Sequence, residues 1–313
     1  MSRTSERKGN RRREKRKKKE RAKSRRTASR EEAPVDRERE GGAEEPHPII
    51  YLDTNVYNAL VHERDIRGRL SSLVMDLGGA GIGLSETNIL ELQGASRIHH
   101  DLVELLKFYP TVLLKRAAVL LDEEVAAYPE ERTGEVHTAL LFDPACETED
   151  HPLLSALRDS RIEAAAEEMR RQAKDAPARH AALRDNFSPA ASGKYERRQA
   201  HEFADKLGFQ WLAGSHPEFA EKIVEAGTME TSAFKTIRMH AYLVFWRFYL
   251  NRRTPNAKSD LGDQAHARFY PYCRAVVVEN DAAESLRQIK KHSALLEGVD
   301  IMSLRDLRAY GSG

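Results

Sequence analysis

The sequence has few cysteines and no long apolar run, and these two absences limit the classes of protein it can be. Its two cysteines, Cys146 and Cys273, are too few for a disulfide framework or a cysteine-based zinc site. No apolar stretch approaches the roughly 20 residues that a membrane-spanning helix needs. The first thirty residues lack the apolar core of a secretory signal. We therefore expect a cytoplasmic protein, in a reducing compartment, with no membrane partner.

The motifs of several enzyme classes are also missing. No Lys-Ser or Lys-Thr follows the glycine-rich stretch at residues 78–83, so this stretch is not a phosphate-binding P-loop. No Gly-x-Ser-x-Gly motif and no Cys/His arrangement indicates covalent catalysis. The histidines show no zinc-like pairing, because His99 and His100 are adjacent and would point apart on a helix. Other side chains must therefore carry the chemistry.

The charge is distributed very unevenly, although the formal net charge is only +2. Residues 1–30 contain sixteen Lys and Arg against three Glu, a net charge of +13, which leaves −11 for the rest of the chain. Residues 1–46 contain almost no large apolar side chain, so we expect a disordered basic arm that binds nucleic-acid phosphates. A localisation signal or a solubilising tail has the same composition, and both stay open. The phosphate-binding residues expected in the arm are Arg11, Arg12, Arg13, Lys15, Arg16, Lys17, Lys18 and Lys19.

The rest of the chain is organised around the stretch from Pro48 to Leu60. Four apolar residues at 49–52 run without alternation into Asp53, which predicts a short strand buried on both faces, as in a parallel sheet. Asp53 then lies at the carboxyl end of this strand, where open α/β sheets bind their ligands. In the alternative interpretation, Asp53 or Thr54 only caps the helix that follows.

Apolar periodicity predicts strands and helices on both sides of a long helical region. Residues 128–255 hold no strand signal and are typical of charged, alanine-rich helices. The strands expected after the first are residues 82–84, 111–114, 275–278 and 299–302. The expected helices are residues 55–77, 101–109, 153–176, 195–213, 217–226, 231–250, 259–270 and 282–292, together with helices that start at Ser85, Asp122 and Leu304.

Acidic residues recur at the ends of these elements. Asp53 follows the first strand and precedes the polar pair Thr54 and Asn55. Ser85 caps the helix after the second strand, and Glu91 lies six positions further on. Glu91 lies nearly two turns into its helix, too far along for a role at the helix N-terminus, so from spacing alone it is interpreted as an exposed helical Glu.

A second acidic group stands late in the chain. Asp260 and Asp263 form an Asp-x-x-Asp pair at a helix start, and Asp281 follows the next strand. In order and residue type, these motifs and the two earlier ones resemble those of the PIN-domain nucleases. The Asp-x-x-Asp pair, with His266 and residues 272–278 after it, is similar to one PIN subgroup in particular.

The resemblance covers residues 47–120 and 256–313. It implies a PIN-like three-layer α/β fold with a central parallel sheet, interrupted by an all-α insertion. We expect the last helix of the insertion to dock on the core of the PIN-like domain. The expected order is a basic arm at 1–46, the first part of the PIN-like domain at 47–127, the insertion at 128–255 and the second part at 256–313.

The resemblance also implies a metal site. Asp53, Glu91, Asp263 and Asp281 would be its catalytic ligands, with Asp260 assisting. Converging carboxylates repel one another, which would raise their pKa values, and a divalent cation removes this conflict. Oxygen ligands favour Mg2+ or Mn2+ over zinc. Such a site can activate water for phosphodiester hydrolysis, so we expect an endonuclease, with RNA favoured over DNA.

Further residues stand beside these acids. We expect Asn55 to hold a carboxylate from outside the ligand set, and we expect His266 to be a structural histidine. Glu279 and Asn280 stand where PIN proteins carry Thr or Ser and a second Asp. The fourth ligand is therefore Asp281, Glu279 or both.

The same departure favours the main alternative, a nucleic-acid-binding or adaptor protein in which a PIN fold has lost turnover. A haloacid-dehalogenase-type phosphatase also begins with an Asp at a strand end, but it needs a second Asp where Asn55 stands. The expected partner is RNA before DNA. A second copy of the chain and an antitoxin-like inhibitory protein stay open as further partners.

Overall fold

The computed structural model describes residues 48–136, 139–140, isolated positions between 164 and 182, and residues 186–225, 227, 231–251 and 260–311. Pro46–Gly313 form one compact unit. The predicted basic arm at 1–46 lies outside the described residues, as does most of the predicted helix at 153–176. Among the described residues, no helix is both long and apolar enough to cross a membrane.

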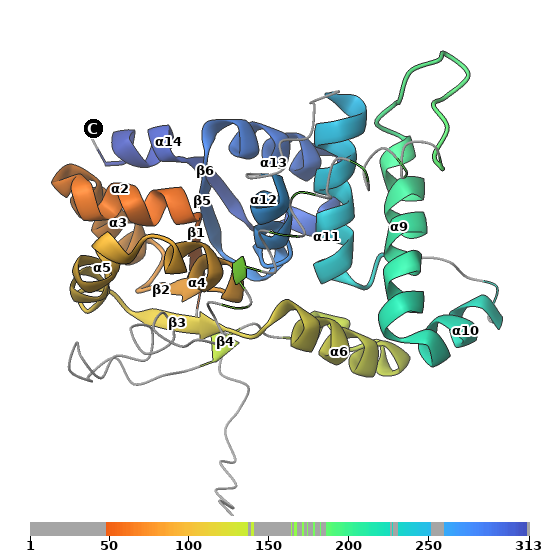
Figure 1. Cartoon of the computed structure of the whole chain (residues 1–313), viewed down its shortest axis with the longest axis horizontal. Coiled ribbons are helices and arrows are strands. Elements are labelled where there is room, and N and C mark those ends of the chain that lie inside the picture. Colours follow the sequence, from red (N-terminus) through yellow and green to blue (C-terminus); the bar gives the residue numbers. More distant parts are fainter. Residues whose placement is uncertain are drawn as a thin grey trace, which may run out of the picture. The chain divides into compact units, whose positions relative to one another are not determined.

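Six short strands form one sheet in the order β4-β3-β2-β1-β5-β6 (Figure 1). Five of them are parallel, and only β4 pairs antiparallel, with β3. This central parallel sheet is the one that the apolar runs predicted. The strands are β1 Ile49–Leu52, β2 Gly81–Leu84, β3 Thr111–Leu114, β4 Ala139–Leu140, β5 Ala275–Val278 and β6 Asp300–Ser303.

The strand order reverses beside β1. The chain runs from β1 outward through β2 and β3, and later returns to pair β5 with the other side of β1. Such a reversal is a topological switch point, and open α/β sheets bind ligands there, at the carboxyl ends of the strands. The residues that follow β1 and β5 therefore lie at the position where a site is expected.

Helices cover both faces of the sheet. The α-helices are α2 Thr54–His62, α3 Arg64–Asp76, α4 Glu86–Gln93, α5 His99–Leu106, α6 Ala117–Ala127, α9 Gln199–Ser215, α10 Pro217–Glu225, α11 Lys235–Val244, α12 Asp260–Ala267, α13 Asn280–His292 and α14 Leu304–Ala309. The short 3-10 helices are η1 Ser96–Ile98, η2 Tyr128–Glu130, η3 Thr133–Glu135, η6 Tyr270–Tyr272 and η7 Ala294–Leu296, and η5 Phe245–Leu250 is a π-helix that continues α11.

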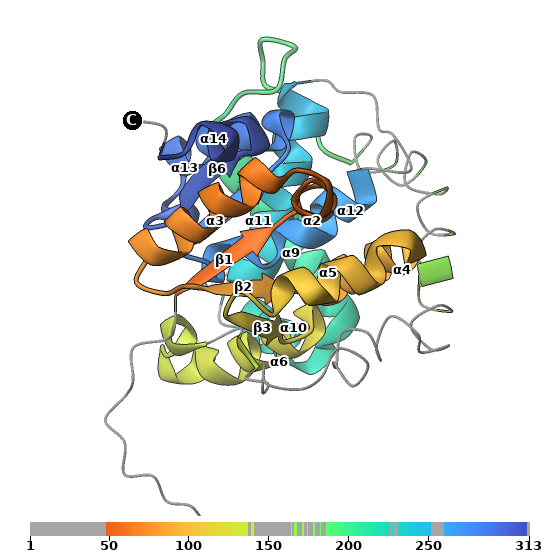
Figure 2. The same ribbon diagram turned by 90° about the vertical axis from the view of Figure 1, so that its left-hand side faces the viewer.

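Alternating side chains of the strands build two separate cores. Ile50 and Leu52 of β1 pack with α2, α3, α5 and α14 on one face. Ile49 and Tyr51 pack with α6, α9, α11 and α13 on the other (Figures 1 and 2). Each buried Ile or Leu contributes roughly 1.5–3 kcal/mol of transfer free energy. The result is a three-layer α/β fold with a central parallel sheet, as the sequence predicted.

The structure differs from several of these predictions. The helix expected to start at Asp122 begins at Ala117, and the two-residue strand β4, which pairs with β3, lies within residues 128–255, where the sequence predicts no strand.

Two predicted helices are interrupted. The helix expected at 55–77 is broken at Glu63, whose backbone is extended (φ −116°, ψ 104°), so that α2 and α3 are separate helices. Arg308 holds the Glu63 carboxylate at 2.8 Å, a contact 245 positions apart in the sequence. The helix expected at 231–250 ends its α-helical part at Val244 and continues as η5.

Candidate metal centre

Asp53 lies where β1 ends and α2 begins. Its backbone N–H donates to the carbonyl oxygen of Val277 at 2.9 Å, which extends the β1–β5 pairing by one residue. Its side chain does not cap α2, so the alternative interpretation of Asp53 as a capping residue is wrong. The residue is only 4% exposed, and Nε2 of His266 lies 3.7 Å from its Oδ1. Burying a carboxylate is costly unless it is paired, so the partners of this group decide what it can do.

Glu91 enters the same place from α4. The predicted cap of this helix is confirmed, because Ser85 and Asn88 form a capping box at its start. A Cβ atom at position 262 of α12 would lie 2.0 Å from Oε1 of Glu91, so a side chain there would require the carboxylate to move from its place beside His266. Thr54 also donates a hydrogen bond to Glu91.

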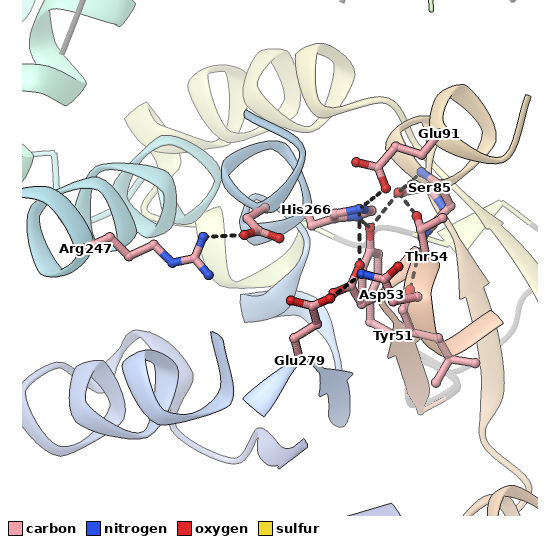
Figure 3. A network of polar contacts seen from close by, with 12 residues as sticks. Tyr51, Asp53, Thr54, Ser85, Glu91, Arg247, His266 and Glu279 are labelled. Atoms are coloured by element: carbon pink, nitrogen blue, oxygen red, sulfur yellow. Dashed lines mark hydrogen bonds and ion pairs between the residues drawn. The ribbon is translucent and has the colours of Figure 1, made fainter. Parts of the chain in front are cut away.

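His266 of α12 connects the two acids (Figure 3). Its Nε2 atom lies 3.0 Å from Oε2 of Glu91 and 3.7 Å from Oδ1 of Asp53. One ligand atom from each of these three residues lies within 4.8 Å of the other two. His266 is 1% exposed and both of its ring nitrogens have partners, which fits the structural histidine expected from the sequence, and it also lies between the two acids.

The charges of the three residues are strongly coupled. Burial raises the pKa of Asp53 to about 6; the His266 charge opposes this shift, and Asp263, Glu91 and Glu279 add to it. Burial lowers the pKa of His266, but the charge and hydrogen bond of Glu91, with the charge of Asp53, raise it to about 8. In metal-free protein the imidazolium therefore stands in for a cation between the carboxylates.

Glu91 departs from the expected rise in carboxylate pKa. Burial raises its pKa, but the charge of His266 and the hydrogen bonds from His266 and Thr54 outweigh burial, and the net shift is downward. The two acids are thus unequal: Glu91 is the stabilised partner of His266, and Asp53 is the carboxylate left with an unfavourable charge.

The later aspartates lie outside this group. Asp263 lies one turn before His266 on α12 and forms an ion pair with the buried Arg247 of η5. Its charge still raises the pKa values of Asp53 and His266, so it is near the group without being one of its converging ligands. Asp281 is exposed in the first turn of α13, outside the three-residue group found among the described residues. Asp260 begins α12, but its side chain lies outside the described residues. The structure therefore brings Asp53 and Glu91 together and leaves Asp263 and Asp281 apart.

Glu279 and Asp281 are the two alternatives for the fourth ligand, and of these Glu279 directly follows β5, next to the strand that carries Asp53. It accepts a hydrogen bond from Nδ2 of Asn55. The two residues predicted to support the site thus contact each other. Glu279 is exposed, so it adds negative charge at the rim of the group.

Comparisons with protein-family models, curated proteins and solved structures found no match to this chain. Function therefore has to be inferred from the donor set itself. Two carboxylates and an imidazole that converge at strand ends are a donor set that holds divalent cations.

Proposed function

We propose that this chain is a divalent-metal-dependent endonuclease that hydrolyses phosphodiester bonds, with RNA as its preferred substrate. The observation that carries the proposal is the carboxylate of Asp53. It is buried, burial and the neighbouring acids raise its pKa to about 6, and it shares His266 with Glu91. Its location at the switch point of the sheet is where such folds bind ligands.

The donor set fits a divalent cation. Asp53, Glu91 and His266 would hold it, and Glu279 at the rim adds negative charge that favours it. A cation relieves the repulsion that burial creates between the two carboxylates, which a single imidazolium offsets only in part. When bound, such an ion can activate water and stabilise the charge that builds on a phosphodiester.

The substrate class follows from charge. The body of the chain is net negative by sequence and would repel a polyanion, whereas residues 1–30 carry a net charge of +13. A basic arm of this kind binds phosphate backbones without sequence preference. The order of acidic motifs, which resembles that of PIN nucleases, supports cleavage over binding alone, and the buried free thiol of Cys273 suits the cytoplasmic location that we propose.

A cleavage assay with a matched control tests the proposal. Purified protein is incubated with single-stranded RNA and Mn2+ or Mg2+, and then with a chelator. We expect cleavage that needs the metal, that is lost in Asp53→Asn, and that persists in Asp65→Asn, which removes an exposed acid of α3. Equal background cleavage by the parent and Asp53→Asn would refute the nuclease.

The second candidate is a nucleic-acid-binding or adaptor protein without turnover. Asp263, one of the four expected catalytic acids, is engaged by Arg247, and this observation favours it. The same preparations distinguish the two candidates. If the chain is an adaptor, the parent protein and the Asp53→Asn variant should bind RNA with the same affinity, and neither should cleave it.

A further inference from the structure

A chain of buried hydrogen bonds runs away from His266 toward the start of α4 (Figure 3). Nδ1 of His266 contacts the hydroxyl of Tyr51, and this hydroxyl lies 2.7 Å from Oγ of Ser85. Oγ of Ser85 lies 2.9 Å from Oδ1 of Asn88. All four side chains are buried, so water does not compete for these bonds. The direction of each bond can be worked out from the far end.

At the end of this hydrogen-bond chain far from His266, the hydrogen bonds of Asn88 determine how its side-chain amide is oriented. Its Nδ2 donates to the carbonyl oxygen of Leu52 at 3.0 Å, and the backbone N–H of Ser85 donates to its Oδ1 at 3.0 Å. If the amide were flipped, Nδ2 would face another donor and Oδ1 would face a carbonyl oxygen. Only one orientation of the Asn88 amide is therefore compatible with its neighbours.

The orientation of Asn88 in turn determines which way the hydroxyl of Ser85 donates its hydrogen bond. Its Oγ accepts from the backbone N–H of Asn88 at 3.2 Å, and its single proton is directed to Oδ1 of Asn88. If that proton pointed to Tyr51 instead, two oxygen lone pairs would face each other across 2.9 Å. Tyr51 must therefore donate its own proton to Ser85.

Tyr51 then determines the protonation of His266. The phenol has one proton and directs it to Ser85, so its oxygen can only accept from Nδ1 of His266. Stacking on Phe269, with ring centroids 5.9 Å apart, holds the Tyr51 ring in place. Nδ1 of His266 is thus the nitrogen that stays protonated, and Nε2 is the nitrogen that faces Asp53 and Glu91. In the metal-free imidazolium Nε2 donates to Glu91, and its lone pair becomes available to a cation when that proton leaves.

We infer that Tyr51, Ser85 and Asn88 act as positioning residues that present Nε2 of His266 to the cation, so that the site selects an imidazole-binding ion such as Mn2+ over Mg2+. This inference rests on the proposed metal centre and narrows the Mg2+ or Mn2+ expected from oxygen ligands alone. Mg2+ takes oxygen ligands and water almost exclusively. Mn2+ shares the preference for carboxylates but, as a first-row transition ion, also binds at sites that mix nitrogen and oxygen ligands. Partners that orient a ligating histidine contribute about 10- to 100-fold to metal affinity.

Metal binding without RNA tests the inference. Pulsed electron paramagnetic resonance of the Mn2+-loaded parent should show nitrogen coupling, which is lost in His266→Gln. In calorimetry, Mn2+ should bind the parent more tightly than Mg2+. Tyr51→Phe should weaken Mn2+ binding about tenfold and leave Mg2+ binding nearly unchanged. The control is Tyr57→Phe, which also removes the hydroxyl of a buried tyrosine, one that donates to the carbonyl oxygen of Gly83.

Three results would overturn the inference: Mn2+ bound without nitrogen coupling in the parent, equal affinities for both ions, or the same effect of Tyr51→Phe and Tyr57→Phe. The electron paramagnetic resonance spectrum of the Mn2+-loaded parent tests the inference even if a variant fails to fold. Nitrogen-coupled Mn2+ in a protein that cleaves no RNA would refute the nuclease and keep the inference. Cleavage with Mg2+ in a protein whose bound Mn2+ shows no nitrogen coupling would keep the nuclease and refute the inference about His266.

Discussion

A Cβ atom on Gly262 would lie 2.0 Å from Oε1 of Glu91, although the two residues are far apart in the sequence. Real side chains do not approach so closely, so the missing side chain of Gly262 gives the Glu91 carboxylate its room beside α12. His266 lies one turn further along the same helix and binds that carboxylate at 3.0 Å. One helix therefore both makes space for Glu91 and holds it.

Gly262→Ala should separate stability from metal binding. Alanine favours a helix over glycine by roughly 0.5–1 kcal/mol, so the melting temperature should stay level or rise slightly. The new methyl group should displace the Glu91 carboxylate and weaken Mn2+ binding at least about tenfold, measured by calorimetry. Gly68→Ala in α3, where a Cβ meets nothing within 4 Å, is the control and should leave Mn2+ binding unchanged. Parent-like affinity in Gly262→Ala would contradict this account of Glu91.

The stabilisation by metal should increase with pH. The folded-state pKa of Asp53 is raised to about 6 and that of His266 to about 8, so metal-free protein loses stability as pH rises through each value. A cation competes with these protons, and it should therefore raise the melting temperature more at pH 8.5 than at pH 5.5. Thermal denaturation with and without Mn2+ checks this, with Asp53→Asn as the variant that loses most of the effect. A metal shift that is independent of pH would contradict it.

Asp263→Asn should affect stability more than metal affinity. Arg247 is 4% exposed in its side chain, and the Asp263 carboxylate is its partner. Removing one charge of a buried pair typically costs about 3–5 kcal/mol, which denaturant unfolding would detect. Mn2+ affinity should change by less than about tenfold, because Asp263 is not among the converging ligands. If Asp263→Asn lost Mn2+ binding at unchanged stability, Asp263 would be a ligand after all.

Glu124→Gln should make the protein more stable at high pH. Glu124 of α6 is fully buried and accepts a hydrogen bond from the backbone N–H of Thr236 at the start of α11. Burial raises its pKa to about 7, although hydrogen bonds from Tyr272 and Thr236 oppose the shift. The parent therefore loses roughly 3 kcal/mol of stability as pH rises from the usual Glu pKa of 4.5 to about 7. Denaturant unfolding at about pH 4 and at about pH 8.5 should show similar stability at the lower pH and a more stable variant at the higher.

Deletion of residues 1–46 should weaken RNA binding and flatten its salt dependence. Each lost phosphate contact should change the slope of log K against log salt by about 0.7 on single strands. Binding is measured by fluorescence anisotropy at several salt concentrations, with a metal-free buffer to prevent cleavage. An unchanged slope would reduce the arm to a localisation or solubility device.

The sequence predicts the frame of this site because the frame depends on local patterns. Runs of four apolar residues identify β1 and β5, a shorter apolar run identifies β3, and a capping serine identifies the start of α4. These elements place Asp53 at a strand end. The meeting of Glu91 with Asp53 is expected only from the resemblance to the PIN motifs, and the structure brings the two residues together.

The rest depends on contacts that spacing does not encode. Whether a histidine on an amphipathic helix faces core or cleft is decided by the neighbours it meets, and Tyr51 and His266 are 215 positions apart. The acid at position 263 pairs with an arginine on η5, a helix that the sequence predicts only as part of a longer one. Periodicity likewise misses the break at Glu63, because its partner Arg308 is 245 positions away in the sequence.

The pairing of β1 with β5 also has a consequence for synthesis. β1, β2 and β3 leave the ribosome early, whereas α12 and β5 follow only after the long helical stretch. Until then Asp53 and Glu91 have no His266 between them, and the donor set is incomplete. The nuclease that we propose would therefore be unable to assemble its metal site as a nascent chain, before α12 has been synthesised.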